Sequence, residues 1–310
     1  MDQLLAALRG AAETTRLRIL ALLSKGELTV GELVSILEQS QPRVSRHLKL
    51  MCEAGLLDRF QEGTVVFYRL AEGGVGEKLN QALVPLMPEA DVCFAEDLAA
   101  FNDIRSARFE KAQSYFRENA ATWDEIRSLH ISEEQVEAAL LEMQGGREQG
   151  RMLDIGTGTG RMLELFSSKV DSALGIDVSR DMLSVARGNL AAHGLEHCQV
   201  RRGDMYELGV DAGSCDLIVF HQVLHFAEDP ARAISQAADA LSVGGTMLIA
   251  DFAPHEEEFL RSEHAHRRLG FADDEIINMG EHAGLKRGEV RHLDGGKLRV
   301  TIWCFEKIVK

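Results

Sequence analysis

The apolar positions near the start of the chain have helical spacing. Leucine, isoleucine and valine side chains recur on one face over Glu13–Leu23 and again over Val30–Glu38, which predicts two helices. Thr29 directly precedes the second helix and Glu32 follows three residues later, so this pair can form a capping box. Pro42, which is favoured in a first helical turn, begins a third helix.

A hairpin-like segment follows the third helix. Leu57–Leu70 carries β-branched and aromatic residues from Val65 to Tyr68, and Glu62-Gly63 can form its turn. Three helices followed by a hairpin predict a winged helix. The third helix is rich in basic and hydroxyl side chains, which is typical of the helix of a helix-turn-helix unit that enters the major groove.

Helical composition continues through the middle of the chain. One long helix is predicted over Ala95–Ala121 and another from Ser132 through Met143. This segment can be a linker that packs domains together, or a lid over a cofactor pocket with Tyr115, Trp123 and Arg127 near the substrate. A long helix here can also join two subunits.

From Arg151 onward, strand-like and helix-like segments alternate. The predicted strands are Met152–Ile155, Ser172–Asp177, Cys198–Gly203, Cys215–His221, Thr246–Asp251, Gly288–Arg291 and Leu298–Lys307. The predicted helices include Arg161–Ser168, Asp181–His193, Pro230–Leu241 and Asp273–Ala283. This alternation indicates an α/β, Rossmann-like domain with a mostly parallel seven-stranded sheet, whose ligand binds at the carboxyl ends of the strands.

Charge is distributed unevenly along the 310 residues. The net charge is -15, which argues against a general nucleic-acid binder, yet residues 1–70 carry nine Lys/Arg and eight Asp/Glu. Residues 1–70 are therefore able to bind a polyanion such as DNA despite the negative charge of the whole chain. No apolar run is long enough to span a membrane, and the start at Met1 lacks the pattern of a signal peptide, so we expect a cytoplasmic protein without membrane association.

The five cysteines are scattered, and no two have Cys-x-x-Cys spacing. We therefore expect reduced cysteines and neither a structural disulfide nor a cysteine-rich zinc site. The run His255–His266 contains several histidines and glutamates but matches no metal-binding helix motif. A solvated, charged helix is the interpretation we favour for it, and no metal site is predicted.

Three joined segments of the first part, TTRLRILALLSKGELTVGEL, SQPRVSRHLKLMCEAGLL and GTVVFYRL, resemble the ArsR-type winged-helix transcription regulators over about residues 3–75. The resemblance implies a homodimer that binds a double-stranded DNA operator. The residues it places at DNA are Gln41, Arg43, Ser45, Arg46, His47 and Lys49 on the recognition helix, with Arg59 and Arg69 on the hairpin. Metal-sensing members carry a Cys-x-Cys pair where this chain has Thr29 and Gly31, so that thiolate site is absent.

A glycine-rich loop follows the first strand of the second half. In Asp154-Ile155-Gly156-Thr157-Gly158-Thr159-Gly160-Arg161, the third glycine of a dinucleotide fingerprint would fall at Arg161, so that fingerprint fails. The acid two residues before the first glycine suits a cation better than a pyrophosphate. S-adenosylmethionine carries a sulfonium and an ammonium group and no phosphate, and Asp154 can pair with its ammonium group.

Two further strand ends suit the same cofactor. A carboxylate at Asp177 can accept both ribose hydroxyls, Asp204 can accept from the adenine amino group, and the Met205 backbone N–H can donate to the ring. The chain resembles the class I S-adenosylmethionine-dependent methyltransferases over about residues 120–310. The cofactor-binding residues we predict are Asp154, Gly156, Thr157, Gly158, Gly160, Asp177, Val178, Met182, Asp204, Met205 and His221.

The fourth strand ends at His221 and is followed by His225, near the expected methyl-transfer face. Either histidine can act as a general base, since histidine titrates near neutrality. Alternatively, both shape the pocket, because transfer to a thiolate or carbanion needs no base. No Asn/Asp-Pro-Pro-Tyr motif follows this strand, which argues against methylation of DNA amino groups. The strand ends also carry no pair of cysteine thiolates, which argues against arsenite methylation.

These predictions combine into three parts: a winged helix over 1–75, a helical linker, dimerisation segment and lid over 76–145, and a methyltransferase domain over 146–310. The leading hypothesis is a DNA-binding regulator fused to an enzyme that methylates a small molecule and releases S-adenosylhomocysteine. One rival is a non-catalytic repressor that senses either cofactor form, and another is an enzyme whose winged helix only dimerises.

Overall fold

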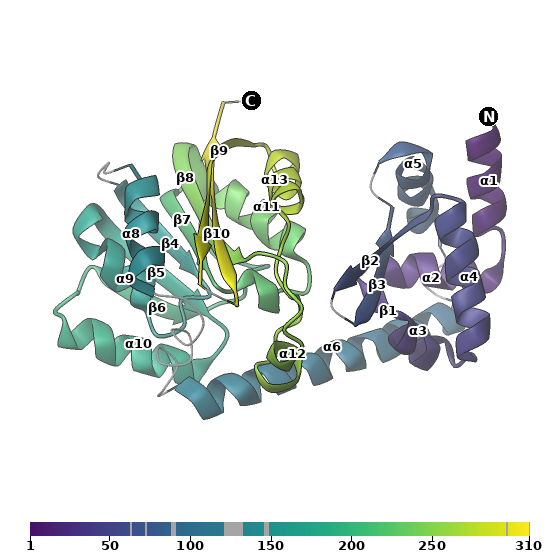
Figure 1. Ribbon diagram of the computed structural model, residues 1–310, viewed down its shortest axis with the longest axis horizontal. Coiled ribbons are helices and arrows are strands. Elements are labelled where there is room, and N and C mark those ends of the chain that lie inside the picture. Colours follow the sequence, from purple (N-terminus) through teal and green to yellow (C-terminus); the bar gives the residue numbers. More distant parts are fainter. Residues whose placement is uncertain are drawn as a thin grey trace. The chain divides into compact units, whose positions relative to one another are not determined.

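The computed structural model describes residues 1–62, 64–71, 73–87, 91–120, 133–145, 149–295 and 297–309. The chain divides into two compact units, Met1–Lys111 and Ala112–Lys310 (Figure 1). Within the described ranges, no helix combines the length and the apolar character needed to cross a lipid bilayer. The division into 1–75, 76–145 and 146–310 remains a prediction about domains.

The first unit is a winged helix with additional helices at both ends. Its elements are α1 (Asp2–Ala11), α2 (Thr14–Leu23), β1 (Leu28–Thr29), α3 (Val30–Leu37), α4 (Gln41–Glu53), β2 (Leu57–Glu62), β3 (Val65–Leu70), α5 (Gly74–Leu83), the 3-10 turn η1 (Val84–Leu86) and most of α6 (Val92–Asn119). The predicted capping box is confirmed: the Glu32 N–H donates to Thr29 Oγ1, and the Thr29 N–H donates to Glu32 Oε2. The predicted hairpin is also confirmed, with Leu57 opposite Leu70.

The core of this unit includes a residue that is distant in sequence. Phe101 of α6 is 2% exposed and packs with apolar side chains of α2, α3 and α4. Asp97 of the same helix accepts from Arg18 Nε at 2.6 Å and from Arg18 Nη2 at 2.5 Å. A bidentate arginine–carboxylate pair of this kind has well-defined geometry, so it fixes the first half of α6 to α2.

The second unit is a mostly parallel seven-stranded sheet, as the sequence predicts. After the end of α6 its elements are α8 (Glu133–Met143), β4 (Gln149–Ile155), α9 (Arg161–Phe166), η3 (Ser167–Lys169), β5 (Val170–Asp177), α10 (Arg180–Ala192), β6 (Cys198–Arg202), β7 (Cys215–His221), η4 (Leu224–Phe226), α11 (Pro230–Ala240), β8 (Leu241–Phe252), α12 (Phe259–Glu263), α13 (Asp273–His282), β9 (Leu285–Asp294) and β10 (Arg299–Lys307). The strand order is β6-β5-β4-β7-β8-β10-β9. Only the pairings of β10 are antiparallel among the named strands of this sheet.

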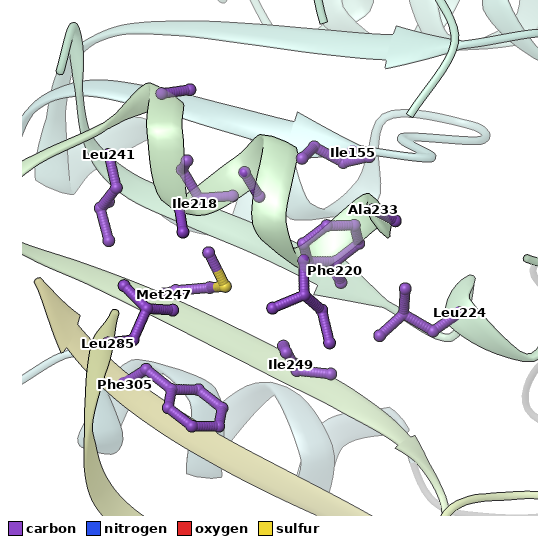
Figure 2. Close-up of a cluster of buried hydrophobic side chains, with 14 of the residues drawn as sticks. Ile155, Ile218, Phe220, Leu224, Ala233, Leu241, Met247, Ile249, Leu285 and Phe305 are labelled. Carbon is purple, nitrogen blue, oxygen red and sulfur yellow. The ribbon is translucent and has the colours of Figure 1, made fainter. Parts of the chain in front are cut away.

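Alternation along the strands divides the core into two layers. Met152 of β4 packs in a cluster with α8 and α9, whereas its neighbour Leu153 packs in a second cluster with α11 and α13. Figure 1 shows α8, α9 and α10 on one face of the sheet and α11 and α13 on the other. Figure 2 shows Phe220 of the second cluster near Ala233 of α11. Because both faces are covered, the strands are nearly continuous apolar runs.

Candidate functional site

Helix α4 presents a polar face to solvent. Val44, Leu48 and Met51 are fully buried, which fixes the rotation of the helix. The exposed residues of the predicted DNA-binding set on this helix are Gln41, Arg43, Ser45, Arg46 and Lys49. The burial pattern therefore directs the predicted base- and phosphate-contacting side chains outward from the unit.

His47 differs from the rest of that set. Its side chain is 13% exposed, and its Nδ1 lies 3.7 Å from Oε2 of Glu13, the N-cap residue of α2. Burial lowers the pKa of His47, and the neighbouring Glu13 carboxylate opposes that shift. The structure therefore places His47 against α2 rather than among the outward-facing side chains of α4.

The hairpin supplies the two remaining predicted DNA-binding residues. Arg59 on β2 is exposed, whereas the guanidinium of Arg69 on β3 lies 5.3 Å from the centroid of the Phe60 ring. Phe60 itself stacks on Phe67 at 5.6 Å. This cation–π contact holds Arg69 in one place on the hairpin.

The glycine-rich loop after β4 uses backbone conformations that favour glycine. Gly156, Gly158 and Gly160 have φ values of 73°, 51° and 87°. The N–H groups of Gly156 and Thr157 both donate to the Ile176 carbonyl of β5 at 2.9 Å. Asp154 is 1% exposed, and its Oδ2 accepts from the Thr157 hydroxyl at 2.6 Å. The acid before the loop thus helps to fix the loop.

Asp177 connects the next strand to the same loop. Its Oδ2 accepts from the Gly158 N–H at 3.0 Å, and its Oδ1 accepts from the Ser179 N–H at 2.8 Å. Burial raises the pKa of Asp177, and the backbone N–H groups work against that rise. Because β4 and β5 are adjacent and parallel, the two strand ends meet at one edge of the sheet.

These strand ends enclose a cavity of about 500 Å³, counting the space at its open mouth. It is lined by Phe116, Asp154, Gly156, Thr157, Gly158, Met162, Asp177, Met182, His221, Gln222, Val223 and Phe226. Seven of the residues predicted to bind a cofactor are therefore brought together in one lining.

The other predicted residues lie outside this lining: Gly160, Val178, Asp204, Met205 and His225. Asp204 is exposed and its Oδ1 accepts from the Tyr206 N–H at 2.9 Å, whereas Met205 packs on the second core cluster. Gly160 occupies the N-cap position of α9, where an added Cβ would lie 3.2 Å from the Ala186 Cβ. Their roles toward a cofactor remain predictions.

One carboxylate beside the cavity was not among the predicted residues. Glu133, the first residue of α8, accepts from Gln222 Nε2 at 3.4 Å, and its Oε2 lies 3.7 Å from His221 Nε2. Gln222 itself has a φ of 51°, which is unusual for a residue other than glycine. The sequence indicated Glu133 only as part of a helix start, because nothing local shows that α8 begins beside the end of β7.

His225 is held by a buried carboxylate. Asp251, 1% exposed, accepts from His225 Nδ1 at 2.7 Å and also from the backbone N–H groups of His225 and Phe252. The ring of His266 stacks on His225 with centroids 4.0 Å apart. Of the two histidines proposed as general bases, His221 thus lines the cavity, whereas His225 is not part of the lining and is held in a fixed orientation by Asp251.

The interpretation of 255–266 as a solvated, charged helix is wrong. Only Phe259–Glu263 is helical, and the histidines on both sides of it contact aromatic rings: His255 meets Phe252, and His264 meets Phe259. Apolar and ring contacts with the sheet outweigh the helical preference of this short segment. Among the described residues, no group of three His, Cys, Asp or Glu side chains is arranged to hold a metal ion.

The predicted lid lies mostly outside the described residues. Trp123 and Arg127 are not among them, whereas Tyr115 is described and its hydroxyl forms a hydrogen bond with His264 Nδ1 at 2.6 Å. Burial raises the pKa of Tyr115 to about 12. The neighbouring Phe116 lines the cavity. The end of α6 therefore contributes to the wall of the site.

Replacing Gly156 with alanine is expected to destabilise the protein by about 1–3 kcal/mol. The φ of Gly156 is 73°, and an added Cβ would lie 2.3 Å from Val223 Cγ2. Thermal unfolding measures the effect. Gly188→Ala is the matched control, because a Cβ at this exposed position of α10 meets nothing within 4 Å. Equal melting temperatures for the two variants would contradict the prediction.

Acidification is expected to destabilise the second unit through His255. Burial, with repulsion from His225, lowers the pKa of His255 from 6.5 to about 4. Between these values the unfolded chain binds more protons than the native state, so stability is full above pH 6.5 and falls as the pH drops toward 4. In thermal unfolding, His255→Gln should lose less stability over this range than the unmodified protein. His193→Gln, at a side chain 63% exposed, is the control and should behave like the unmodified protein.

Comparisons with known proteins agree with this two-part architecture. Residues 13–59 match the family described as bacterial regulatory protein, arsR family, and residues 153–249 match the family described as methyltransferase domain. Both resemblances identified in the sequence are thereby confirmed at the level of these families.

The curated relatives match one part of the chain each. The chain is 30% identical over 111 residues to the uncharacterized methyltransferase YcgJ of Bacillus subtilis, which is 36% of this chain and 44% of that protein. It is 52% identical over 61 residues to the arsenical resistance operon repressor of Escherichia coli, which is 19% of this chain and 52% of that protein. The chain spans about half the length of the curated relatives it matches.

Two solved structures resemble the fold of the second part. YcgJ of Bacillus subtilis has a TM-score of 0.51 at 19% identity, covering 57% of this chain and all of that one. Geranyl diphosphate C-methyltransferase of Streptomyces coelicolor, solved with S-adenosyl-L-homocysteine, has a TM-score of 0.51 at 12% identity, covering 57% of this chain and 78% of that one. At these identities the likeness shows the fold.

Proposed function

Since the chain joins an arsR-family segment to a methyltransferase domain, we propose that it binds a double-stranded DNA operator as a homodimer and transfers a methyl group from S-adenosylmethionine to a small-molecule acceptor. The observation that carries the cofactor part is the single cavity lining that joins the glycine loop after β4, Asp177 after β5 and His221 after β7. Three adjacent parallel strands thus direct polar groups toward one cavity, which supports the proposal.

The residues present fit this cofactor. Asp177 faces the cavity with a carboxylate that can accept hydroxyl hydrogen bonds in addition to those it accepts from backbone N–H groups. Asp154 is buried beside the loop and supplies negative charge for an ammonium group. No lysine or arginine occurs in the described lining, which agrees with a ligand that lacks phosphate.

When bound, the cofactor supplies an electrophilic methyl group on a cationic sulfur. The protein's part in the transfer is to hold cofactor and acceptor in line and to exclude water, which the apolar lining side chains Met162, Val223 and Phe226 favour. His221, beside Glu133, can take a proton from the acceptor. His225, oriented by Asp251, supports the segment that carries Phe226.

The DNA-binding part of the proposal rests on the outward polar face of α4. The proposed homodimer rests on α1, where Leu4, Leu5 and Leu8 are 39–42% exposed on a single helix. Exposed leucines grouped in this way suit a protein–protein contact. Analytical ultracentrifugation of the unmodified protein tests the dimer, and a monomer at all concentrations would refute the proposed homodimer.

A sensory role is the second candidate, and one element favours it. Helix α6 supplies Phe101 to the core of the first unit and Phe116 to the cavity of the second. Occupancy of the cavity can therefore bias an element that the winged helix also uses. Equal operator affinity with and without cofactor would exclude this coupling, because linkage requires reciprocity.

Calorimetric titration of the full chain with S-adenosylmethionine and with S-adenosylhomocysteine tests the cofactor proposal. We expect binding of one molecule per chain. Absence of binding by both forms would refute the proposal. Release of S-adenosylhomocysteine in the presence of candidate acceptors then separates an enzyme from a sensor.

A further inference from the structure

Two phenylalanine rings form part of the cavity wall. Phe116, near the end of α6, and Phe226, in η4, both line the cavity, and their ring centroids are 4.9 Å apart with an interplanar angle of 76°. This is an edge-to-face pair, the arrangement that aromatic rings prefer. The face of each ring carries partial negative charge, which attracts cations.

The phenylalanine pair lies toward one end of the cavity. In the sheet order β5-β4-β7, Asp177 ends β5, the glycine loop follows β4, and Phe226 comes shortly after β7. The pair is therefore on the far side of the glycine loop from Asp177. On the proposed function, on which this inference rests, the ribose contacts Asp177 and the sulfur of the cofactor lies toward β7.

The charges around the cavity also favour a cation. Asp154 and Asp177 line it, Glu133 lies 3.7 Å from its lining residue His221, and no lysine or arginine is in the described lining. A positive sulfur would thus meet carboxylates at a distance and aromatic rings at close range. A neutral sulfur at the same place would keep only the weaker contact between a thioether sulfur and an aromatic ring.

Phe226 is held in place before any ligand arrives. Its ring contacts His225 at 4.1 Å and His266 at 5.2 Å between centroids, and Asp251 fixes His225 through its ring and its backbone N–H. A ring that is already packed loses little conformational entropy when a ligand binds, so its attraction for a cation contributes to affinity.

We infer that Phe116 and Phe226 are specificity-determining residues that weight this site toward the sulfonium form of the cofactor, S-adenosylmethionine, over S-adenosylhomocysteine, whose sulfur is neutral. The two rings act on charge at sulfur and not on the adenosine part, which both forms share. The site therefore responds to the methylation state of the cofactor.

Calorimetric titration of both cofactor forms into the full chain tests this inference. Phe116→Leu and Phe226→Leu keep apolar volume and remove the ring. Each variant should therefore lose about three- to tenfold more affinity for S-adenosylmethionine than for S-adenosylhomocysteine. Phe226→Tyr keeps the ring and should retain the affinity ratio of the unmodified protein. Phe259→Leu is the matched control, because this ring contacts His264 and is not part of the lining.

The possible outcomes separate this inference from the proposed function. If both leucine variants still bind the cofactor and lose equal affinity for its two forms, the rings do not respond to the charge at sulfur. The inference then fails, while the proposed cofactor site is still supported. If the unmodified protein binds neither form, the proposed cofactor site fails and the inference fails with it. Thermal unfolding of each variant confirms that a reduced affinity does not come from unfolding.

Discussion

Replacing Asp177 with alanine is expected to weaken binding of S-adenosylmethionine by about 100-fold, or about 3 kcal/mol. The change removes a charged acceptor for two ribose hydroxyls, and each such hydrogen bond contributes about 1.5–3 kcal/mol. It also leaves the Gly158 and Ser179 N–H groups without the carboxylate that they contact at 3.0 and 2.8 Å. The glycine loop should therefore lose part of its fixed shape. Calorimetric titration of the full chain measures the change in affinity.

The same strand provides a control for this prediction. Asp171 lies near the start of β5, is exposed and is remote along the strand from the carboxyl end that carries Asp177. Asp171→Ala changes the charge equally and should leave cofactor affinity unchanged. Comparable losses in the two variants would show that net charge, and not the Asp177 contact, determines affinity. Thermal unfolding should show that both variants remain folded.

The double variant Arg43→Ala, Arg46→Ala is expected to lose about 2–4 kcal/mol of specific DNA affinity, roughly 30- to 1000-fold. Both side chains are exposed on α4, whose opposite face is fixed by Val44 and Leu48 in the core. Removal of the guanidinium groups therefore takes away interactions with DNA without disturbing packing. The salt dependence of binding should also become shallower, by about one counterion for each phosphate that is no longer neutralised.

Duplexes selected from a random-sequence pool by the unmodified protein serve as the probe. Arg9→Ala, Lys78→Ala is the control, because both residues are exposed on other helices of the same unit and the change in charge is identical. If the two double variants lose equal affinity, binding depends only on overall charge and α4 is not the recognition helix. If selection yields no bound duplex, the regulator proposal itself is refuted.

Local sequence signals were sufficient to predict most of the helices and strands. Thr29 and Glu32 marked the start of α3 because a capping box needs only residues three apart. The strands of the sheet were recognised because they are apolar runs between turn residues. The helices α1 and α5 and the short strand β1 were not predicted. Strand β1 has two residues and exists only because Leu28 and Thr29 pair with Tyr68 and Phe67, which are distant in sequence.

Only part of the candidate site was predicted, because the rest depends on contacts between residues that are distant in sequence. Asp154, the glycine loop and Asp177 occur at strand ends, where the direction of a parallel sheet brings them to one edge. Glu133 and Phe116 belong to helices, and their approach to β7 and η4 depends on how those helices pack. His47 has the composition of a DNA-reading residue, but the rotation of α4 turns it toward Glu13.

Local sequence patterns were enough to identify the two families, the order of the strands along the chain and the loop in which Gly156, Gly158 and Gly160 adopt positive φ, because these depend on short-range stereochemistry and on period-two and helical patterns. Which side chains share the cavity follows from the packing of distant segments. Packing placed Phe226 beside Phe116, fixed His225 against Asp251, and folded 255–266 inward instead of into a solvated helix. Contacts between residues more than a hundred positions apart follow from the burial of apolar surface across the sheet, which no local pattern encodes.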